Sequence, residues 1–209
     1  MIGIKLKRFM KVTNHNKLAV ICLAAGKSQL PVITKAKSFG YTIFAIDQNR
    51  KANGFKHADY KIFQSTYDAD AIIKELDKFR NKFKWIGVIN RSSGPPVITA
   101  AKICKHFNLP GVPVESAEKL VNKDQMQTAC LEKNIPSPNY EIYDVNDCNT
   151  ISIDTLPVVV KPALSLIGKS GVSVIRSKNK IRSSINYAAE NTINNKILLE
   201  EFLKGPDLS

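Results

Sequence analysis

Acidic residues are missing from the first part of the sequence, where Asp47 is the first of them. The whole chain has 31 lysines and arginines against 18 aspartates and glutamates, a formal net charge of +13. The basic residues before Asp47 are interspersed through segments with strand and helix patterns, and they do not form one run with aromatic residues. This spread argues against a nucleic-acid-binding protein, which stays open as an alternative, and it leaves the basic extension 1–16 without an assigned role.

Long apolar runs are also absent. No run approaches the roughly 20 residues that cross a bilayer, and the basic start has no apolar stretch of the secretory type. We therefore expect a cytoplasmic protein with no membrane partner. The four cysteines lie far apart without a CxxC spacing, and the three histidines match no metal-ligand spacing. Reduced, buried thiols are expected, and no histidine metal site is proposed.

The first half alternates between apolar strands and helical patterns. The continuous apolar run 17–24 predicts a strand buried on both faces, and a helical pattern with Pro31 in its first turn extends to Phe39. Further strands are predicted at 41–46, 58–63 and 85–89, and further helices at 68–82 and 96–107. This alternation predicts a three-layer α/β domain with a parallel sheet over residues 17–113.

Two nucleotide-binding motifs are incomplete at the first turn. Gly26-Lys27-Ser28 resembles the end of a P-loop, but Ile21 occupies the position of the first glycine. The dinucleotide fingerprint lacks two of its three glycines, although Asp47 follows the second strand, where a ribose-binding acid would lie. The sequence therefore argues against both sites.

The pattern changes from residue 114 onward. Helices are predicted at 115–120, 123–133 and 177–191, a strand at 156–162, an antiparallel return strand at 171–175, and a final strand at 196–203. Lys123 begins a helix, Lys161 ends a strand, and Gly168-Lys169-Ser170-Gly171 forms the hairpin between two strands. Two ammonium groups and a loop of backbone N–H groups can converge on a polyphosphate, although each lysine alone is more often a solvated charge. Glu200 and Glu201 would then lie near the adenine and ribose.

These residues resemble the ATP-grasp carboxylate–amine ligases, the superfamily of biotin carboxylase and carbamoyl phosphate synthetase. The resemblance spans about residues 18–209 and rests on the following segments: Ala24-Ala-Gly-Lys-Ser28, Ala36-Lys37, Asp47, Ala58-Asp59, Leu109-Pro-Gly111, Asn122-Lys123-Asp124, Ile135-Pro-Ser-Pro138, Val159-Val-Lys-Pro162, Ser170-Gly-Val172, Leu199-Glu-Glu-Phe-Leu203 and Gly205. It implies a Rossmann-like pre-ATP-grasp domain at 17–113. The first part of an α+β ATP-grasp domain would follow at 114–209, with a lid at about 136–203.

The resemblance also implies roles for individual residues. Lys123 and Lys161 would contact the ATP phosphates, and the loop 163–170 would close over them, although this loop has Leu164, Leu166 and Ile167 where the family is usually glycine-rich. The implied cofactor-binding set continues with Gly168, Lys169, Ser170, Gly171, Glu200, Glu201, Phe202, Leu203 and Asp207. The implied reaction joins an unidentified carboxylate to an amine or thiol through an acyl phosphate, with ATP and Mg²⁺. Arg91 is a candidate for gripping a carboxylate.

In the family, the Mg²⁺ ligands and the catalytic residues follow the segment that resembles this chain. We therefore expect them beyond Ser209 and expect the chain alone not to turn over. A fragment or split product of a ligase and a non-catalytic ATP-binding or regulatory module both stay open. We further expect Leu198, Leu199 and Phe202 to belong to a strand with an unpaired edge, which favours a homodimer or pairing with a complementary C-terminal chain.

Overall fold

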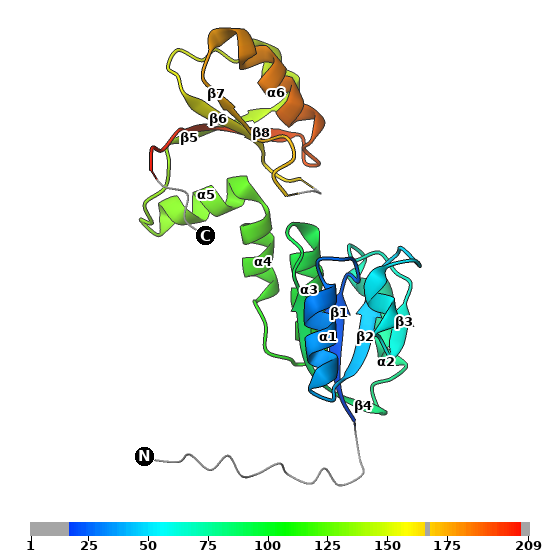
Figure 1. Cartoon of the computed structure of the whole chain (residues 1–209). Coiled ribbons are helices and arrows are strands. Elements are labelled where there is room, and N and C mark those ends of the chain that lie inside the picture. The colour runs from blue at the N-terminus through cyan, green and yellow to red at the C-terminus, as the bar shows by residue number, and fades with distance from the viewer. Residues whose placement is uncertain (1–16, 166–167, 206–209) are drawn as a thin grey trace, which may run out of the picture.

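The computed structural model describes residues 17–165 and 168–205, and its first sheet has four parallel strands. The strands are β1 (Lys17–Leu23), β2 (Thr42–Ile46), β3 (Tyr60–Ile62) and β4 (Phe83–Asn90), in the spatial order β3-β2-β1-β4 (Figure 1). The central strand β1 pairs with β2 on one side and β4 on the other. The predicted parallel sheet is confirmed.

Helices cover both faces of this sheet. One face packs against α1 (Leu30–Ser38), whose buried Ile33 meets Val20 and Cys22 of β1. The other face packs against α2 (Ala69–Asp77) and α3 (Pro95–His106). Helix α2 ends before the predicted residue 82, because the following residues form a turn instead. The result is the three-layer arrangement expected from the sequence.

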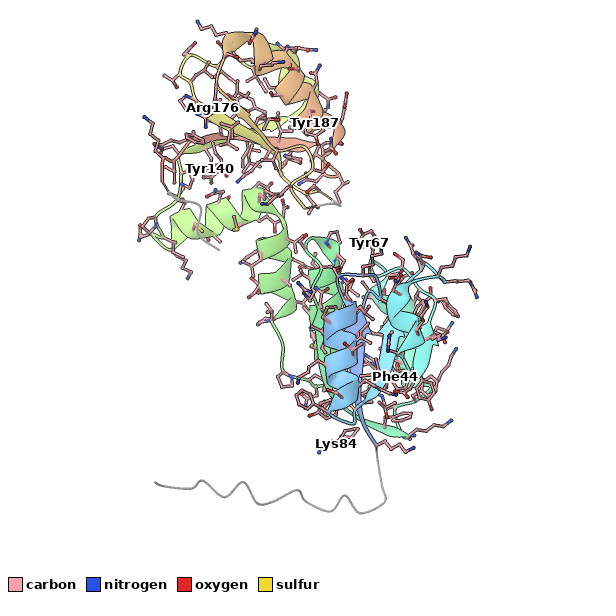
Figure 2. All side chains as sticks on the ribbon, viewed as in Figure 1. Phe44, Tyr67, Lys84, Tyr140, Arg176 and Tyr187 are labelled. Carbon is pink, nitrogen blue, oxygen red and sulfur yellow. The ribbon has the colours of Figure 1, made fainter. Side chains whose placement is uncertain are left out.

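An aromatic cluster fills the α2 side of the sheet around Phe44, which is fully buried (Figure 2). Its ring stacks on Tyr60 at a centroid distance of 4.3 Å, and Phe79, Phe83 and Trp85 meet it edge-on at 4.8–5.2 Å. Such offset and edge-to-face contacts add to the burial of apolar surface. The cluster ties β2, β3 and β4 to the end of α2.

A second sheet forms the other lobe and is antiparallel. Its strands are β5 (Tyr140–Asp144), β6 (Val158–Pro162), β7 (Ser173–Ile175) and β8 (Lys196–Glu201), in the order β5-β8-β6-β7. Helix α6 (Ile181–Glu190) covers one face, where Ile185 packs against Val160, Ile175 and Ile197. Short 3₁₀ helices at Val145–Thr150 and Lys178–Lys180 complete this lobe, and a third at Asn53–Lys56 belongs to the first.

The structure overturns the expectation of an unpaired edge at the last strand. β8 lies inside the sheet, where it pairs with β5 on one side and β6 on the other, and Leu198 is fully buried. β5 was not predicted, because this half-exposed strand, Tyr-Glu-Ile-Tyr-Asp, alternates apolar and acidic residues only weakly. The premise for dimerisation through Leu198, Leu199 and Phe202 is therefore wrong.

Helices α4 (Val114–Val121) and α5 (Lys123–Glu132) lie between the two sheets, as Figure 1 shows. Asn122 separates them with an extended backbone, φ −95° and ψ 109°, which turns the chain between the helices. Both helices agree with the predicted ranges 115–120 and 123–133. The connector that follows α5 carries Pro136 and Pro138 and leads directly into β5.

All four cysteines are free thiols. Cys22, Cys104 and Cys148 are buried, as expected, and Cys130 is half-buried. Burial raises the pKa of the Cys22 thiol to about 12. None of the described helices is long and apolar enough to cross a membrane.

Replacing Phe44 with alanine should destabilise the first lobe by about 3–5 kcal/mol, because it removes the ring that four other aromatic rings contact. The measurement is urea unfolding followed by circular dichroism. Tyr67→Ala is the matched control, since Tyr67 is 48% exposed and its loss should change stability by about 0.5 kcal/mol or less. Equal effects of the two variants would contradict this view of the core.

Candidate functional site

The start of helix α5 is fixed to the end of strand β6. The Lys123 backbone N–H donates to the Ala163 carbonyl at 2.9 Å, and the Asn194 amide donates to the Asn122 side chain at 3.4 Å. Beside them, the Lys196 ammonium lies 3.3 Å from the buried Asp124 carboxylate. These contacts hold the first turn of α5 against the strand ends of the second sheet.

Three of the residues singled out from the sequence meet there. Lys161 and Glu200 come from adjacent strands of the sheet, and the Lys161 Nζ lies 2.5 Å from the Glu200 Oε1 in a mostly buried ion pair. Lys123 belongs to the same group, because both side chains act on its ammonium, although burial has the largest effect on its pKa. Burial lowers the pKa of the Lys123 ammonium, the nearby Lys161 ammonium lowers it further, and Glu200 opposes both.

The group holds two ammonium ions around a single carboxylate. Glu200 neutralises one positive charge, so the site keeps an excess of one. Burial is the main cause of the lowered pKa of Lys123, and repulsion from Lys161 adds to it. A bound anion would relieve that repulsion. The arrangement is therefore suited to a phosphate or another strong anion.

Gln127 completes this group and was not predicted. It lies one helical turn after Lys123, is buried, and donates from Nε2 to Glu200 Oε1 at 2.8 Å. Because a carboxylate only accepts hydrogen bonds, it fixes the orientation of the amide. The Gln127 Oε1 is buried and has no hydrogen-bond partner among the described residues. The sequence could have indicated Gln127 by its position four residues after Lys123, because this spacing places both residues on one face of the helix.

The hairpin 168–171 follows β6, and its backbone has a positive φ angle at two positions. Lys169 and Gly171 have φ of 67° and 76°. A Cβ on Gly171 would come within 2.5 Å of Pro162 and 2.8 Å of Asn191, so only glycine fits there. Ser170 donates to Asn191 at 2.5 Å, which ties the hairpin to the end of α6.

Other predicted site residues are placed differently from the lysines. Lys169 is exposed, whereas Lys161 is partly buried. Leu203 is 60% exposed, while Phe202 lies beneath the Arg176 guanidinium at 4.7 Å from its ring centroid. Asp207, together with Leu166 and Ile167 of the loop, lies outside the described residues.

The two glutamates do not act together. Successive residues of a strand point to opposite faces of the sheet, so Glu200 meets Lys161 while Glu201 points the other way. Glu201 accepts from the Asn139 amide at 3.0 Å and lines a cavity of about 620 Å³ with Glu141 and Asp154. Only Glu200 belongs to the lysine site.

The loops of the first sheet approach this lobe. Arg91 is exposed, and its guanidinium donates to the Ser28 carbonyl at 2.5 Å. Asp47 is likewise occupied, since it accepts from the Ala25 N–H at 2.9 Å and so stabilises the turn after β1. A Cβ on Gly168 would come within 2.8 Å of the Ser93 hydroxyl. The hairpin and the loop 90–94 are therefore in direct proximity.

Among curated proteins, the chain is 29% identical over 148 residues to the uncharacterized protein y4rH of Sinorhizobium fredii, a match covering 68% of this chain and 30% of that protein. It is 25% identical over 190 residues to formate-dependent phosphoribosylglycinamide formyltransferase of Prochlorococcus marinus, covering 88% of this chain and 47% of that enzyme. The chain thus spans less than half the length of these relatives. No family model matches the sequence.

Solved structures share the fold at low sequence identity. An L-amino acid ligase from Bacillus licheniformis superposes with a TM-score of 0.68 at 18% identity, over 93% of this chain and 46% of the ligase. N5-carboxyaminoimidazole synthetase from Staphylococcus aureus, complexed with ADP, superposes with a TM-score of 0.62 at 15% identity, over 91% of this chain and 50% of the synthetase. The chain therefore has the fold of the ATP-grasp ligases over about half of their length, as its sequence predicted.

Proposed function

We propose that this chain is the ATP-binding portion of an ATP-dependent carboxylate–amine or carboxylate–thiol ligase that acts through an acyl phosphate. The observation that carries the proposal is the pairing of Lys123 and Lys161 around Glu200 at the start of α5. Two ammonium groups held together with one compensating carboxylate form a site for a polyanion. The ADP complex among the structures with this fold supports a nucleotide as that polyanion.

The domains follow from the same proposal. Residues 17–113 would be the pre-ATP-grasp domain and residues 114–209 the first part of the ATP-grasp domain, with the lid at about 136–203. The backbone of Glu200–Leu203 and Asp207 would lie on the nucleoside side, with the Glu200 side chain directed to Lys161, and Gly168–Gly171 would lie on the phosphate side. The close approach of Gly168 to Ser93 supports a hairpin that closes toward the first sheet.

Magnesium does not fit the residues at hand. Within 17–165 and 168–205, no group of three histidine, cysteine, aspartate or glutamate side chains is placed to hold a metal ion. The Asp124 carboxylate near the site is engaged by Lys196. The role proposed for this chain is therefore to bind and orient the phosphates, without a part for Mg²⁺.

Replacing Lys161 with methionine should weaken ATP binding about tenfold or more, because a hydrogen bond to a charged group contributes about 1.5–3 kcal/mol. Lys123→Met should have an effect of similar size. Isothermal titration calorimetry with ATP on the full chain gives the dissociation constants. Lys105→Met is the matched control, because Lys105 is an exposed lysine of α3 far from the site in the sequence.

Unchanged affinity in both site variants would contradict the assignment of the phosphates to these lysines. Steeply salt-dependent binding of oligonucleotides without ATP binding would instead favour the nucleic-acid alternative. ADP release is the readout for catalysis, measured after a candidate complementary chain and carboxylate are added. ATP binding with no ADP release under any such condition would favour a non-catalytic module.

The affinity for ATP should also fall as the pH rises toward the ordinary lysine pKa. The pKa of Lys123 is lowered in the folded chain, so this ammonium loses its proton at a lower pH than an ordinary lysine. A neutral amine no longer attracts a phosphate. Lys123→Arg keeps its charge throughout this range, so its affinity should hold to higher pH than that of the wild type.

The measurement is the ATP dissociation constant between pH 7 and about pH 10, a range chosen to end near the ordinary lysine pKa. Lys105→Arg should reproduce the wild-type profile. The same pH profile for wild type and Lys123→Arg would show that Lys123 does not titrate at the phosphate site.

A further inference from the structure

Strand β4 is an edge of the first sheet and differs from every other sheet edge that the structure describes. It has eight residues, of which only Lys84 is charged, and none of the described strands pairs with its outer side. The edges β3 and β7 have three residues each, and β5 carries Glu141 and Asp144. Short length and charge are the usual protections of an edge, whereas β4 is long and has Lys84 as its one charged residue.

An apolar groove runs beside this edge on the α1 face of the sheet. It has a volume of about 330 Å³ and is lined mainly by Val20, Val32, Phe39, Tyr41, Ile86 and Ile89. The Phe39 ring at the end of α1 is 63% exposed, and Ile86 and Ile89 of β4 are only partly buried. A long strand edge with a single charged residue, beside an open apolar groove, is suited to one more strand with apolar residues on one face.

The segment that precedes β1 in the sequence has that pattern. Ile2, Ile4 and Leu6 alternate with Gly3, Lys5 and Lys7. An alternation with period two places the three apolar residues on one side of an extended chain. The sequence before β1 thus offers an amphipathic strand of about the length that β4 leaves unpaired.

We propose that residues 2–6 add to the outer edge of β4 as a fifth strand, with Ile2, Ile4 and Leu6 in the groove beside α1. The backbone groups of β4 that point away from β1 would then be paired, and the exposed ring of Phe39 would be covered. This docking surface serves a segment of the same chain, and it is independent of the nucleotide site.

The tether is long enough and starts at the correct end of the sheet. Lys17, the first residue of β1, pairs with Phe83, the first residue of β4. Residues 7–16 can span about 33 Å when extended, whereas the outer side of β4 is about two strand spacings, roughly 10 Å, from β1. An antiparallel strand brings Leu6 to the Phe83 end, so the connection needs no crossing of the sheet. The tether also gives the segment a millimolar effective concentration at the edge.

Hydrogen–deuterium exchange of the full chain tests this docking. In the wild type, the β4 amides that point away from β1 should be protected. The triple variant I2K/I4K/L6K should exchange them at least tenfold faster, since lysines cannot occupy the apolar groove. The amides of β2 report whether the lobe stays folded, and their exchange should not change.

The matched control replaces the other face of the segment, with Lys5→Ser and Lys7→Ser, and should leave β4 exchange at the wild-type rate. Equal exchange of β4 in the wild type and the triple variant would overturn the proposal. Protection that survives the triple variant and increases with protein concentration would also overturn it, because a second copy of the chain would then cover the edge.

Discussion

The ion pair between Lys161 and Glu200 is the interaction on which the second lobe and its site depend. It joins the neighbouring strands β6 and β8 on the face of the sheet opposite α6. Gln127 binds the same carboxylate oxygen from α5, so one buried acid connects two strands and a helix. Removing one partner of such a buried pair leaves an uncompensated charge, which costs more than the pair itself contributes. The site is therefore also a structural junction.

Much of the fold could be predicted because its signals are local. The apolar run of β1, the proline in the first turn of α1 and the Lys161-Pro162 strand end each specify an element without help from distant residues. β5 could not be predicted in this way, because a half-exposed edge strand has little hydrophobic patterning and depends on β8 for its register. The same omission produced the incorrect expectation that β8 has a free edge.

The site was predictable in its charges but not in its geometry. Lys123 and Lys161 act on one another because strand ends and a helix start meet there, whereas the ion pair of Lys161 with Glu200 was not predicted. Glu201 could have been separated from Glu200 by strand periodicity alone. Gln127 gave no charge signal, and its importance comes from burial against Glu200, which only the packing of α5 on the sheet reveals. Asp47, whose role in a dinucleotide site the sequence argued against, accepts a hydrogen bond from the turn after β1, and Arg91 donates one to Ser28.

The close approach of Gly168 to Ser93 limits how the two lobes can meet. A hydrogen atom at this position leaves room for the serine hydroxyl, whereas a single methyl group would stand only 2.8 Å from its oxygen. Glycine at residue 168 thus lets the hairpin lie close to the loop 90–94, and a larger side chain there would require the Ser93 side chain to shift.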